Sequence, residues 1–321
     1  MSVDLHEDAG RAAPAAGAVP PAIELIGIDK RFGPVHANRA VDLQVIGGTI
    51  HGIIGENGAG KSTLMSILYG YYQADAGEIR VKGAPRHIRH SQDAIAAGIG
   101  MVHQHFMLVD DFSVLENVVL GVEQGPLLSG GLAAARAALK ELADTYGLAV
   151  DPDAPVHDLP VGLQQRVEIL KALYRGAEVL ILDEPTAVLT PQEVDDLFGN
   201  LRRLRAEGKT IVFISHILDE VLGIADRITV LRRGQVIGTL PAAGATKGQI
   251  AEMMVGRPVV LELPVPAVEP GEIRLEMDRV VVMGPRGRPA VREASFAVRG
   301  GEIYGIAGVE GNGQTELVEA L

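Results

Sequence analysis

The chain contains no cysteine and no tryptophan, and aromatic residues make up only 4% of its 321 positions. Without cysteine, neither a disulfide framework nor a thiolate metal site can form, and this composition suits a reducing compartment. Positive charge is also scarce, since 29 Lys and Arg residues stand against 41 Asp and Glu, a formal net charge of −12. Such an acidic chain does not fit a broad nucleic-acid-binding face, so we expect no nucleic-acid partner.

Long apolar runs are missing as well. No segment of the sequence approaches the roughly 18 consecutive apolar residues that a membrane span requires. Residues 1–21 are rich in Ala, Pro and acidic side chains, and they lack the positive and apolar regions of a signal peptide. We therefore expect a disordered tail over 1–21 and a protein that stays in the cytosol. The 47% hydrophobic content still allows a substantial core, and the length predicts about two domains.

The most informative feature that is present is a glycine-rich loop that occurs twice, 253 positions apart. The first copy reads GENGAGKS over 55–62, and the second reads GVEGNGQT over 308–315. The flanking segments follow the same register, so the repeat indicates a duplicated domain. The second copy has Gln314 at the position where the first has Lys61.

Apolar patterns around these loops predict an α/β fold. Residues 23–28 alternate in hydrophobicity like an edge strand, and residues 61–69 are predicted to be a helix that begins at the loop. A further helix is predicted over 191–207, with proline at its start and Gly208 as its stop. Short runs of the kind buried in parallel sheets occur at 50–54, 179–182 and 211–214. Because 110–159 has a helical pattern, we expect an α/β core with an antiparallel β edge and a helical insertion.

The first glycine loop has the composition of a phosphate-binding site. Its glycines allow successive backbone N–H groups to turn toward a bound anion. Lysine at this position reaches the β- and γ-phosphates of a nucleotide, and the hydroxyl that follows it ligates Mg²⁺. An ordinary glycine-rich turn is the alternative, which the preceding strand and following helix disfavour. The residues expected to contact the nucleotide here are Gly55, Asn57, Gly58, Gly60, Lys61, Ser62 and Thr63.

Two adjacent carboxylates follow the apolar run 179–182. Asp183 stands where the strand should end and can hold Mg²⁺ through its water shell. Glu184 can orient or deprotonate an attacking water, a role worth roughly 10²- to 10⁴-fold in rate. An acidic pair after a strand is, by itself, more often an ordinary turn. Together with the glycine loop, the pair predicts an active site.

The order of the remaining motifs resembles that of the ATP-binding-cassette (ABC) ATPases. Residues 159–166, LPVGLQQR, resemble the family's signature, and Gly162 within it is the residue expected to contact nucleotide. Gln104, in MVHQHF, resembles the Q-loop glutamine, and His216 resembles the switch histidine. Phe32 matches the aromatic residue that stacks on adenine in this family.

This resemblance, which covers residues 22–256, implies a P-loop NTPase core that hydrolyses ATP with ATP and Mg²⁺ as cofactors. It implies catalytic roles for Glu184, His216 and Gln104, and a Mg²⁺ site made of Ser62, Gln104 and Asp183. The neighbouring aromatic and histidine residues have simpler interpretations. His103 and His105 are predicted to be polar loop residues rather than metal ligands, and Tyr69, Tyr71 and Tyr72 to be packing residues.

The resemblance also divides the chain into domains. Residues 22–256 correspond to a whole cassette, with a helical subdomain over about 110–165. Residues 257–271 contain several prolines and are predicted to be an extended linker. Residues 272–321 resemble the first part of a second cassette. Because some fifty residues cannot close an α/β domain of the first copy's size, we expect an incomplete second domain or a fragment.

Tandem cassettes whose second loop lacks lysine resemble the ATPase of bacterial sugar and nucleoside importers. The segments 100–109 and 308–314 look more like the nucleoside branch. The resemblance implies a peripheral protein at the cytoplasmic face of the cell membrane, with transmembrane permease subunits and a substrate-binding lipoprotein or periplasmic protein as partners. It also implies pairing with a second cassette or with another copy of the chain. Two alternatives stay open, namely a soluble tandem cassette protein that acts on ribosomes and an inactive truncated cassette.

Pro160 departs from the family pattern, which usually has serine at this position. The serine directs its hydroxyl and N–H at the γ-phosphate across the interface between two cassettes, and proline has neither donor. The head-to-tail arrangement that the resemblance implies pairs this signature with the loop that carries Gln314. We therefore expect one composite site that holds nucleotide but hydrolyses it poorly.

Overall fold

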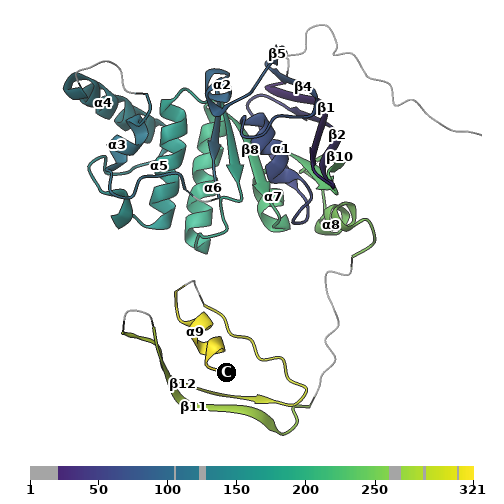
Figure 1. The fold of residues 1–321 in the computed structure, drawn as a ribbon, viewed down its shortest axis with the longest axis vertical. Helices are drawn as coiled ribbons and strands as arrows, with labels where there is room; N and C mark the ends of the chain where they lie inside the picture. Colours follow the sequence, from purple (N-terminus) through teal and green to yellow (C-terminus); the bar gives the residue numbers. More distant parts are fainter. Residues whose placement is uncertain (1–20, 105, 123–127, 260–268, 285–286, 309–310) are drawn as a thin grey trace, which may run out of the picture. The chain divides into compact units, whose positions relative to one another are not determined.

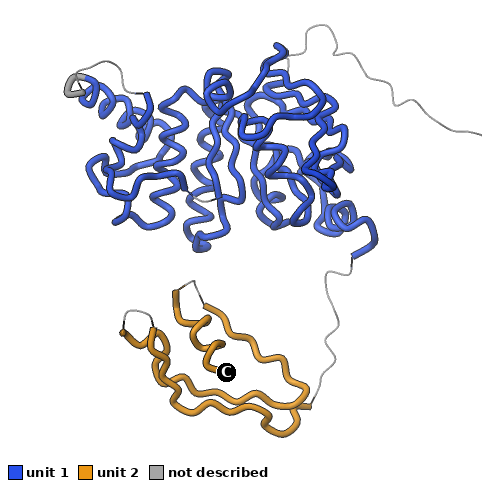
Figure 2. Tube along the Cα trace, in the orientation of Figure 1, with its two compact units in different colours: residues 1–259 blue, residues 260–321 orange. Residues whose placement is uncertain are grey.

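The computed structural model describes residues 21–104, 106–122, 128–259, 269–284, 287–308 and 311–321. The chain divides into two compact units, Met1–Val259 and Val260–Leu321 (Figure 2). The division falls inside 257–271, but most of that predicted linker lies outside the described residues, as does nearly all of the predicted tail. The two units are described separately below.

A six-stranded sheet with the order β10-β9-β3-β8-β7-β6 forms the centre of the first unit. Its strands are β3 (Ile50–Ile54), β6 (Ile99–Val102), β7 (Val179–Asp183), β8 (Thr210–Ser215), β9 (Arg227–Arg232) and β10 (Gln235–Pro241). Neighbours from β6 to β9 are parallel, and β10 returns antiparallel to β9. Every residue of β3, β6, β7 and β8 is buried, as expected for parallel strands covered on both faces. The three buried strands predicted from apolar runs are confirmed.

The helices around this sheet begin and end at recognisable signals. The first unit contains α1 (Lys61–Leu68), α2 (Ser91–Ala96), α5 (Val161–Tyr174), α6 (Pro191–Ala206), α7 (Leu218–Ile224) and α8 (Lys247–Val255). At the start of α6, the Thr190 hydroxyl accepts from the Glu193 N–H while the Glu193 carboxylate accepts from the Thr190 N–H, a capping box with proline at the first turn. Both α1 and α6 lie where the sequence predicts them, and α6 is followed by Gly208 in the left-handed region with φ 83°.

A separate antiparallel sheet has the order β2-β1-β4-β5. Its strands are β1 (Ile23–Phe32), β2 (Val35–Val45), β4 (Ala76–Val81) and β5 (Ala84–Arg86). The predicted antiparallel sheet is therefore present, but the prediction that 23–28 is an edge strand is wrong. Strand β1 pairs with β2 on one side and with β4 on the other. Alternating hydrophobicity reports that one face of a strand is buried and carries no information on whether both of its edges are paired.

The helical insertion lies at one end of the first unit, opposite the antiparallel sheet (Figure 1). It contains α3 (Val114–Val119), α4 (Leu128–Tyr146) and a 3₁₀ turn (Val156–Asp158) that precedes α5. On α4, Leu139 and Tyr146 are buried, and Leu132 and Leu142 pack partly buried against the same core. These four residues form the face of α4 that packs against the core. Among the described residues, no helix is long and apolar enough to cross a bilayer.

The second unit repeats the local geometry of the first around its glycine loop. It consists of the antiparallel pair β11 (Ile273–Met283) and β12 (Pro289–Arg299), followed by α9 (Gln314–Glu319). Gly60 and Gly313 cap α1 and α9 with φ values of 98° and 92°. A side chain on either glycine would strike a backbone carbonyl, that of Ala37 for Gly60 and that of Ala290 for Gly313. Because these carbonyls are also 253 positions apart, the sequence repeat is a repeat of backbone structure.

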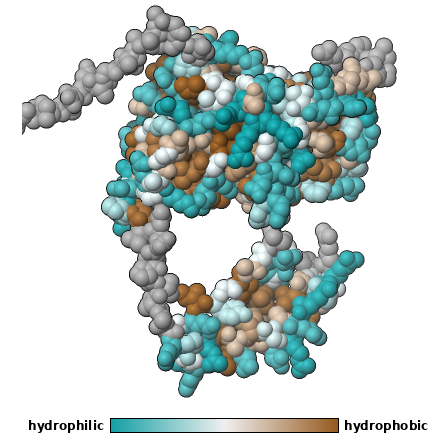
Figure 3. Space-filling view, turned by 180° about the vertical axis from the view of Figure 1, so that it is seen from behind, coloured by the Kyte–Doolittle hydropathy of each residue, from teal (hydrophilic) through white to brown (hydrophobic). Residues whose placement is uncertain are grey.

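The two units differ in the segment before the loop. In the first unit this segment is β3, which pairs with β8 on one side and β9 on the other. In the second unit residues 302–308 form no strand, and Ile303 is 96% exposed. Figure 3 shows hydrophobic residues exposed on this unit. The described part of the second unit contains no strand that could pair with residues 302–308 as β8 and β9 pair with β3. An apolar sequence alone therefore does not form a strand there.

Acid should weaken the first unit through His51 in the middle of β3. The His51 side chain is fully buried and lies 2.7 Å from the Thr229 hydroxyl. Burial lowers the pKa of His51 to about 4, with Arg227 adding a smaller effect in the same direction. The unfolded chain takes up this proton near pH 6.5 and the folded chain does not, so stability should fall between pH 6.5 and 4 by up to about 3 kcal/mol.

The matched variant is His51→Asn, which can still bond Thr229 but does not titrate. We expect the wild type to lose more unfolding free energy than this variant between pH 7 and pH 4.5, as measured by urea denaturation. Parallel losses in the two proteins would show that His51 is not the source of the acid sensitivity.

Candidate nucleotide site

The first glycine loop joins β3 to α1 and folds its lysine back across itself. The Lys61 ammonium donates to the carbonyl oxygens of Gly55 at 2.7 Å and Glu56 at 3.1 Å. Its side chain is almost completely buried. Burial lowers the pKa of Lys61, and the carboxylates of Glu184 and Asp183 oppose that shift. The loop therefore places one cation and the start of a helix at the same point, which is the arrangement that binds phosphate.

Asp183 ends β7 next to this loop. Its Oδ1 accepts a hydrogen bond from the Ser62 hydroxyl at 3.2 Å. Burial raises the pKa of Asp183, while the bond from Ser62 pulls it down. A hydroxyl and a carboxylate oxygen at this spacing fit the oxygen ligands that Mg²⁺ prefers. The described residues contain no group of three or more His, Cys, Asp or Glu side chains that could hold a metal ion by themselves, so Mg²⁺ here would also need oxygens from Gln104 or from the nucleotide.

Glu184 follows directly and has an unusual backbone. Its φ of 47° lies in the left-handed region, which a residue with a side chain rarely adopts. Its N–H donates to the Ile214 carbonyl at 3.0 Å, and its carboxylate lies 3.2 Å from Nδ1 of His216. Such strain persists where the surrounding structure holds it and is found often at active sites. Glu184 and His216 come together because β7 and β8 are parallel neighbours that end at the same edge of the sheet.

A pocket of about 720 Å³ opens over the glycine loop. It gathers side chains from β1, β2, α1, the segment after β6 and the end of β7. The predicted residues that line it are Phe32, Asn57, Gly58, Gly60, Lys61, Ser62, Thr63, Gln104 and Glu184. Gly55 lies at the base of the loop, where a side chain would strike the Leu231 carbonyl. Asp183 and His216 reach the pocket through their bonds to Ser62 and Glu184.

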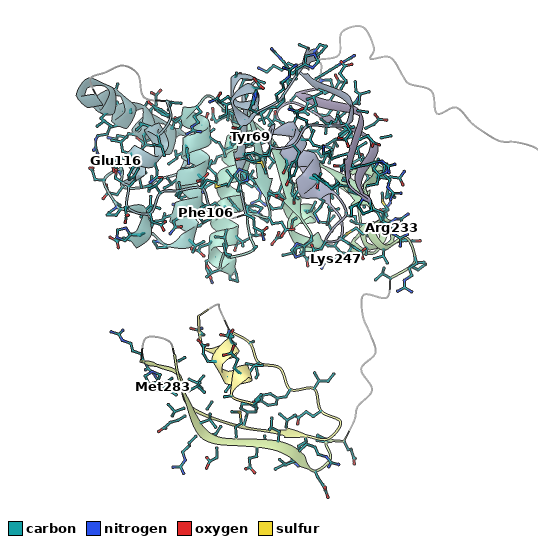
Figure 4. The ribbon with its side chains drawn as sticks, viewed as in Figure 1. Tyr69, Phe106, Glu116, Arg233, Lys247 and Met283 are labelled. Carbon is teal, nitrogen blue, oxygen red and sulfur yellow. The ribbon has the colours of Figure 1, made fainter. Side chains whose placement is uncertain are left out.

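One aromatic ring, that of Phe32, lines the pocket, and Tyr72 packs against this ring. Phe32 is 41% exposed, and its ring packs edge-to-face with Tyr72 at a centroid distance of 5.1 Å. Of the three tyrosines predicted to be packing residues, only Tyr69, labelled in Figure 4, is buried. Tyr71 is 48% exposed and bonds Nε2 of His103 at 3.2 Å, so His103 is a polar loop residue as predicted. His105 lies outside the described residues.

The signature segment does not reach this pocket. Gly162 lies in the first turn of α5, and its N–H donates to the Glu193 carboxylate at 3.2 Å. Pro160 caps the same helix, with its carbonyl accepting from the N–H groups of Leu163 and Gln164. Within the first unit, the structure therefore separates Gly162 from Lys61, Ser62 and the other predicted nucleotide contacts.

The pocket also contains residues that sequence reasoning missed. These are Pro34, then Val35, His36, Ala37 and Arg39 from the start of β2, Ala59 in the glycine loop, and Arg233 from the turn after β9. The β2 residues follow Phe32 so closely that their position next to the ring was a usable signal. Nothing in the sequence near Arg233 marks it as a pocket residue, because its position depends on how β9 packs against the loop.

The sequence comparisons show what this chain is similar to. The model of the ABC transporter family matches residues 39–187. The chain is 50% identical over 299 residues to the nucleoside import ATP-binding protein NupA of Lactococcus lactis. It is 49% identical over 301 residues to the guanosine import ATP-binding protein NupO of Bacillus subtilis, and 47% identical over 304 residues to the ribose import ATP-binding protein RbsA 1 of Burkholderia thailandensis. Each match covers 93% of this chain and 59% of the relative, so the chain spans about three fifths of their length.

Solved structures agree on the fold. The ADP conformation of MJ1267, an ATP-binding cassette of an ABC transporter, matches with a TM-score of 0.64 at 26% identity, covering 74% of this chain and 99% of that chain. The dimeric structure of MJ0796, a bacterial ABC transporter cassette, matches with a TM-score of 0.60 at 25% identity, covering 70% of this chain and all of that chain. The predicted fold class, an ABC-type P-loop NTPase core, is confirmed.

The loop geometry can be tested with Gly60→Ala. Gly60 has φ 98°, and an added methyl group would strike the Ala37 carbonyl, whereas Gly176 has a similar φ of 84° and nothing within 4 Å. The control Gly176→Ala should cost about 1 kcal/mol through backbone strain alone. Gly60→Ala should cost at least about 2 kcal/mol more in urea denaturation, because it adds a steric clash. Equal losses would mean that the close approach to Ala37 does not constrain the loop.

Proposed function

We propose that this chain contains an ABC transporter ATP-binding cassette and that it binds and hydrolyses ATP to energise the uptake of nucleosides through partner permeases. The observation that carries the proposal is that Lys61, the Ser62–Asp183 pair and Glu184 converge on one pocket. The names of NupA and NupO favour nucleosides as the transported solute. The ribose import relative keeps simple sugars as the second candidate.

Binding of the nucleotide follows from the walls of the pocket. The exposed ring of Phe32 offers a stacking surface for adenine. The N–H groups of the loop and the Lys61 ammonium neutralise the β- and γ-phosphates. Ser62 and Asp183, with Gln104 nearby on the pocket wall, hold Mg²⁺, which shields phosphate charge during the reaction.

Hydrolysis requires a base near the γ-phosphate. Glu184 lines the pocket and accepts the proton of the attacking water. His216, at 3.2 Å, orients this carboxylate and senses the γ-phosphate. The strained backbone of Glu184 fixes the direction of its side chain, so the carboxylate does not have to reorganise when the nucleotide arrives.

The signature needed to close the site comes from another cassette. Gly162 is engaged with Glu193 and does not face the pocket of its own unit, which supports a sandwich in which each nucleotide lies between one loop and the other cassette's signature. The dimeric state of the MJ0796 cassette supports the same arrangement. Closure on ATP and reopening after hydrolysis would move the permeases. The protein would sit at the cytoplasmic face of the membrane, with a substrate-binding lipoprotein or periplasmic protein delivering the solute.

Residues 272–321 correspond in this proposal to the start of a second cassette. The repeated left-handed glycines and the carbonyl that faces each of them support it. The Gln314 amide lies against Gly308, much as Lys61 lies over Gly55 in the first loop, but it brings no positive charge. Together with Pro160, which offers no hydroxyl at the start of α5, Gln314 makes one composite site that retains nucleotide and hydrolyses it poorly. The comparisons lend no support to the alternative of a ribosome-acting protein.

Replacing the base should separate binding from turnover. Glu184→Gln keeps the shape of the side chain and removes its ability to accept a proton, so phosphate release should fall about 10²-fold or more while ATP affinity stays within a few-fold. The control Glu207→Gln removes the same charge at the exposed end of α6 and should change neither. Retained turnover in Glu184→Gln would remove Glu184 from the role of base.

The inert composite site makes a second prediction. In a tandem protein with two whole cassettes, Pro160→Ser restores the hydroxyl and N–H of the signature but leaves Gln314 in the facing loop. Because the facing loop still lacks its cation, ATP turnover should change less than twofold. A tenfold gain in steady-state phosphate release would contradict the idea that this site is inert.

A further inference from the structure

Two arginines outside every recognised motif line the nucleotide pocket. Arg39 comes from β2, and Arg233, labelled in Figure 4, comes from the turn between β9 and β10. Both side chains are exposed, and neither makes a hydrogen bond or ion pair with any other residue that the structure describes. Other arginines of this acidic chain do pair, as Arg205 does with Asp226 and Arg136 with Asp153. These two guanidinium groups at one pocket are therefore free to contact an anionic ligand.

The backbone that carries Arg233 is unfavourable for arginine. Arg233 and Gly234 have φ values of 49° and 80°, both in the left-handed region. Two-residue hairpin turns with positive φ at both positions strongly prefer Asn-Gly. Arginine at the first position accepts strain that asparagine would avoid, as Lys82 does in the turn before Gly83, where its side chain forms an ion pair with Glu178.

The turn is anchored directly to the phosphate loop. The Gly234 N–H donates to the Ala59 carbonyl at 3.0 Å, and the Gly234 carbonyl accepts from the Arg39 N–H at 2.8 Å. A side chain at Gly234 would lie 2.7 Å from the Ala37 carbonyl, so glycine is required there. One short segment of backbone thus fixes both arginines relative to the loop whose N–H groups face the phosphates.

We propose that Arg39 and Arg233 form a second cationic contact for the phosphate chain of the nucleotide, with Arg233 as the main contributor. The proposal rests on the ATP site described above. The guanidinium group matches phosphate oxygens with paired donors and stays charged at all physiological pH values. Lys61 is already bonded to two carbonyls of its own loop, and Asp183 and Glu184 add negative charge beside it. Additional cations at the rim of the pocket would therefore strengthen the binding of a polyphosphate.

The test is Arg233→Asn in the 321-residue chain, with ATP, ADP and AMP binding measured by calorimetry in the presence of Mg²⁺. Removing one charge-assisted contact should weaken ATP binding about tenfold, ADP by less, and AMP by less than twofold. Because asparagine suits this turn, the melting temperature without nucleotide should stay unchanged or rise. If Arg233 had only a structural role, its replacement would not weaken ATP binding while leaving the melting temperature unchanged.

Three further proteins complete the experiment. Arg86→Asn, on the exposed strand β5, removes the same charge away from the pocket and should leave affinity unchanged. Arg39→Gln should weaken ATP binding less than Arg233→Asn does. If Arg233→Asn lowers the melting temperature, Arg233→Gly, which tolerates the same φ, must show the same loss of ATP affinity.

The outcomes separate the two proposals. Wild-type protein that binds no ATP would refute the proposed function itself. Wild-type protein that binds ATP, with Arg233 variants within twofold of it, would overturn the arginine contact alone. An equal loss of affinity for ATP and AMP would also overturn it, because the contact would then not be to the β- and γ-phosphates.

Discussion

The parallel register of β3, β8 and β7 is the constraint on which the rest of the site depends. Ile54 is paired with Ser215, and Ile214 with Asp183, so these three strands end side by side. The segments that follow them, the glycine loop, Glu184 and His216, must therefore emerge at one edge of the sheet. Hydrogen bonds along the strands, together with complete burial of all three, fix this edge to within one residue. The chemistry then depends on which side chains stand at the strand ends, and the first glycine loop, Asp183, Glu184 and His216 all lie at or directly after such an end.

Burial at this edge has an electrostatic cost that the nucleotide would offset. The Lys61 ammonium and the Asp183 carboxylate are both removed from water, and burial lowers the pKa of the first and raises that of the second. Each charged form is thus destabilised until an opposite charge arrives. In the proposed function, phosphate would supply the anion for Lys61, and Mg²⁺ would be the partner of Asp183. In the second unit, Gln314 replaces the ammonium with an amide. An amide can keep the loop folded through hydrogen bonds, but it carries no charge that a phosphate could satisfy.

Sequence patterns predicted the parts of the fold that are decided locally. Strands β7 and β8, helix α6 and the first glycine loop all carry short-range signals, namely apolar runs, a proline at the helix start with a glycine stop, and the glycine spacing. The predictions were wrong or missing where residues distant in the sequence determine the structure. The paired second edge of β1 depends on β4, and the absence of a strand at 302–308 depends on partners that the alternation of residues does not encode. The position of the Arg233 side chain likewise depends on a distant partner, because the hydrogen bond from the Gly234 N–H to the Ala59 carbonyl fixes the turn at the pocket. The grouping of Phe32, Gln104 and Glu184 was predicted only through the family resemblance.

The residues with left-handed backbone conformations fall into two groups, those in strands beside a glycine loop and those that line the pocket. Ala40 in β2 has φ 42°, and Glu293, 253 positions later in β12, has φ 51°. Since the same distortion occurs beside a loop with lysine and beside a loop without it, the distortion belongs to the way the strand supports the loop. The left-handed conformations of Glu184 and Arg233 have a different character, because both side chains face the nucleotide pocket. Arg233 occupies a turn position where asparagine would be more stable. Strain that recurs in both units belongs to the scaffold, whereas the strain at Glu184 and Arg233 holds a charged side chain at the pocket.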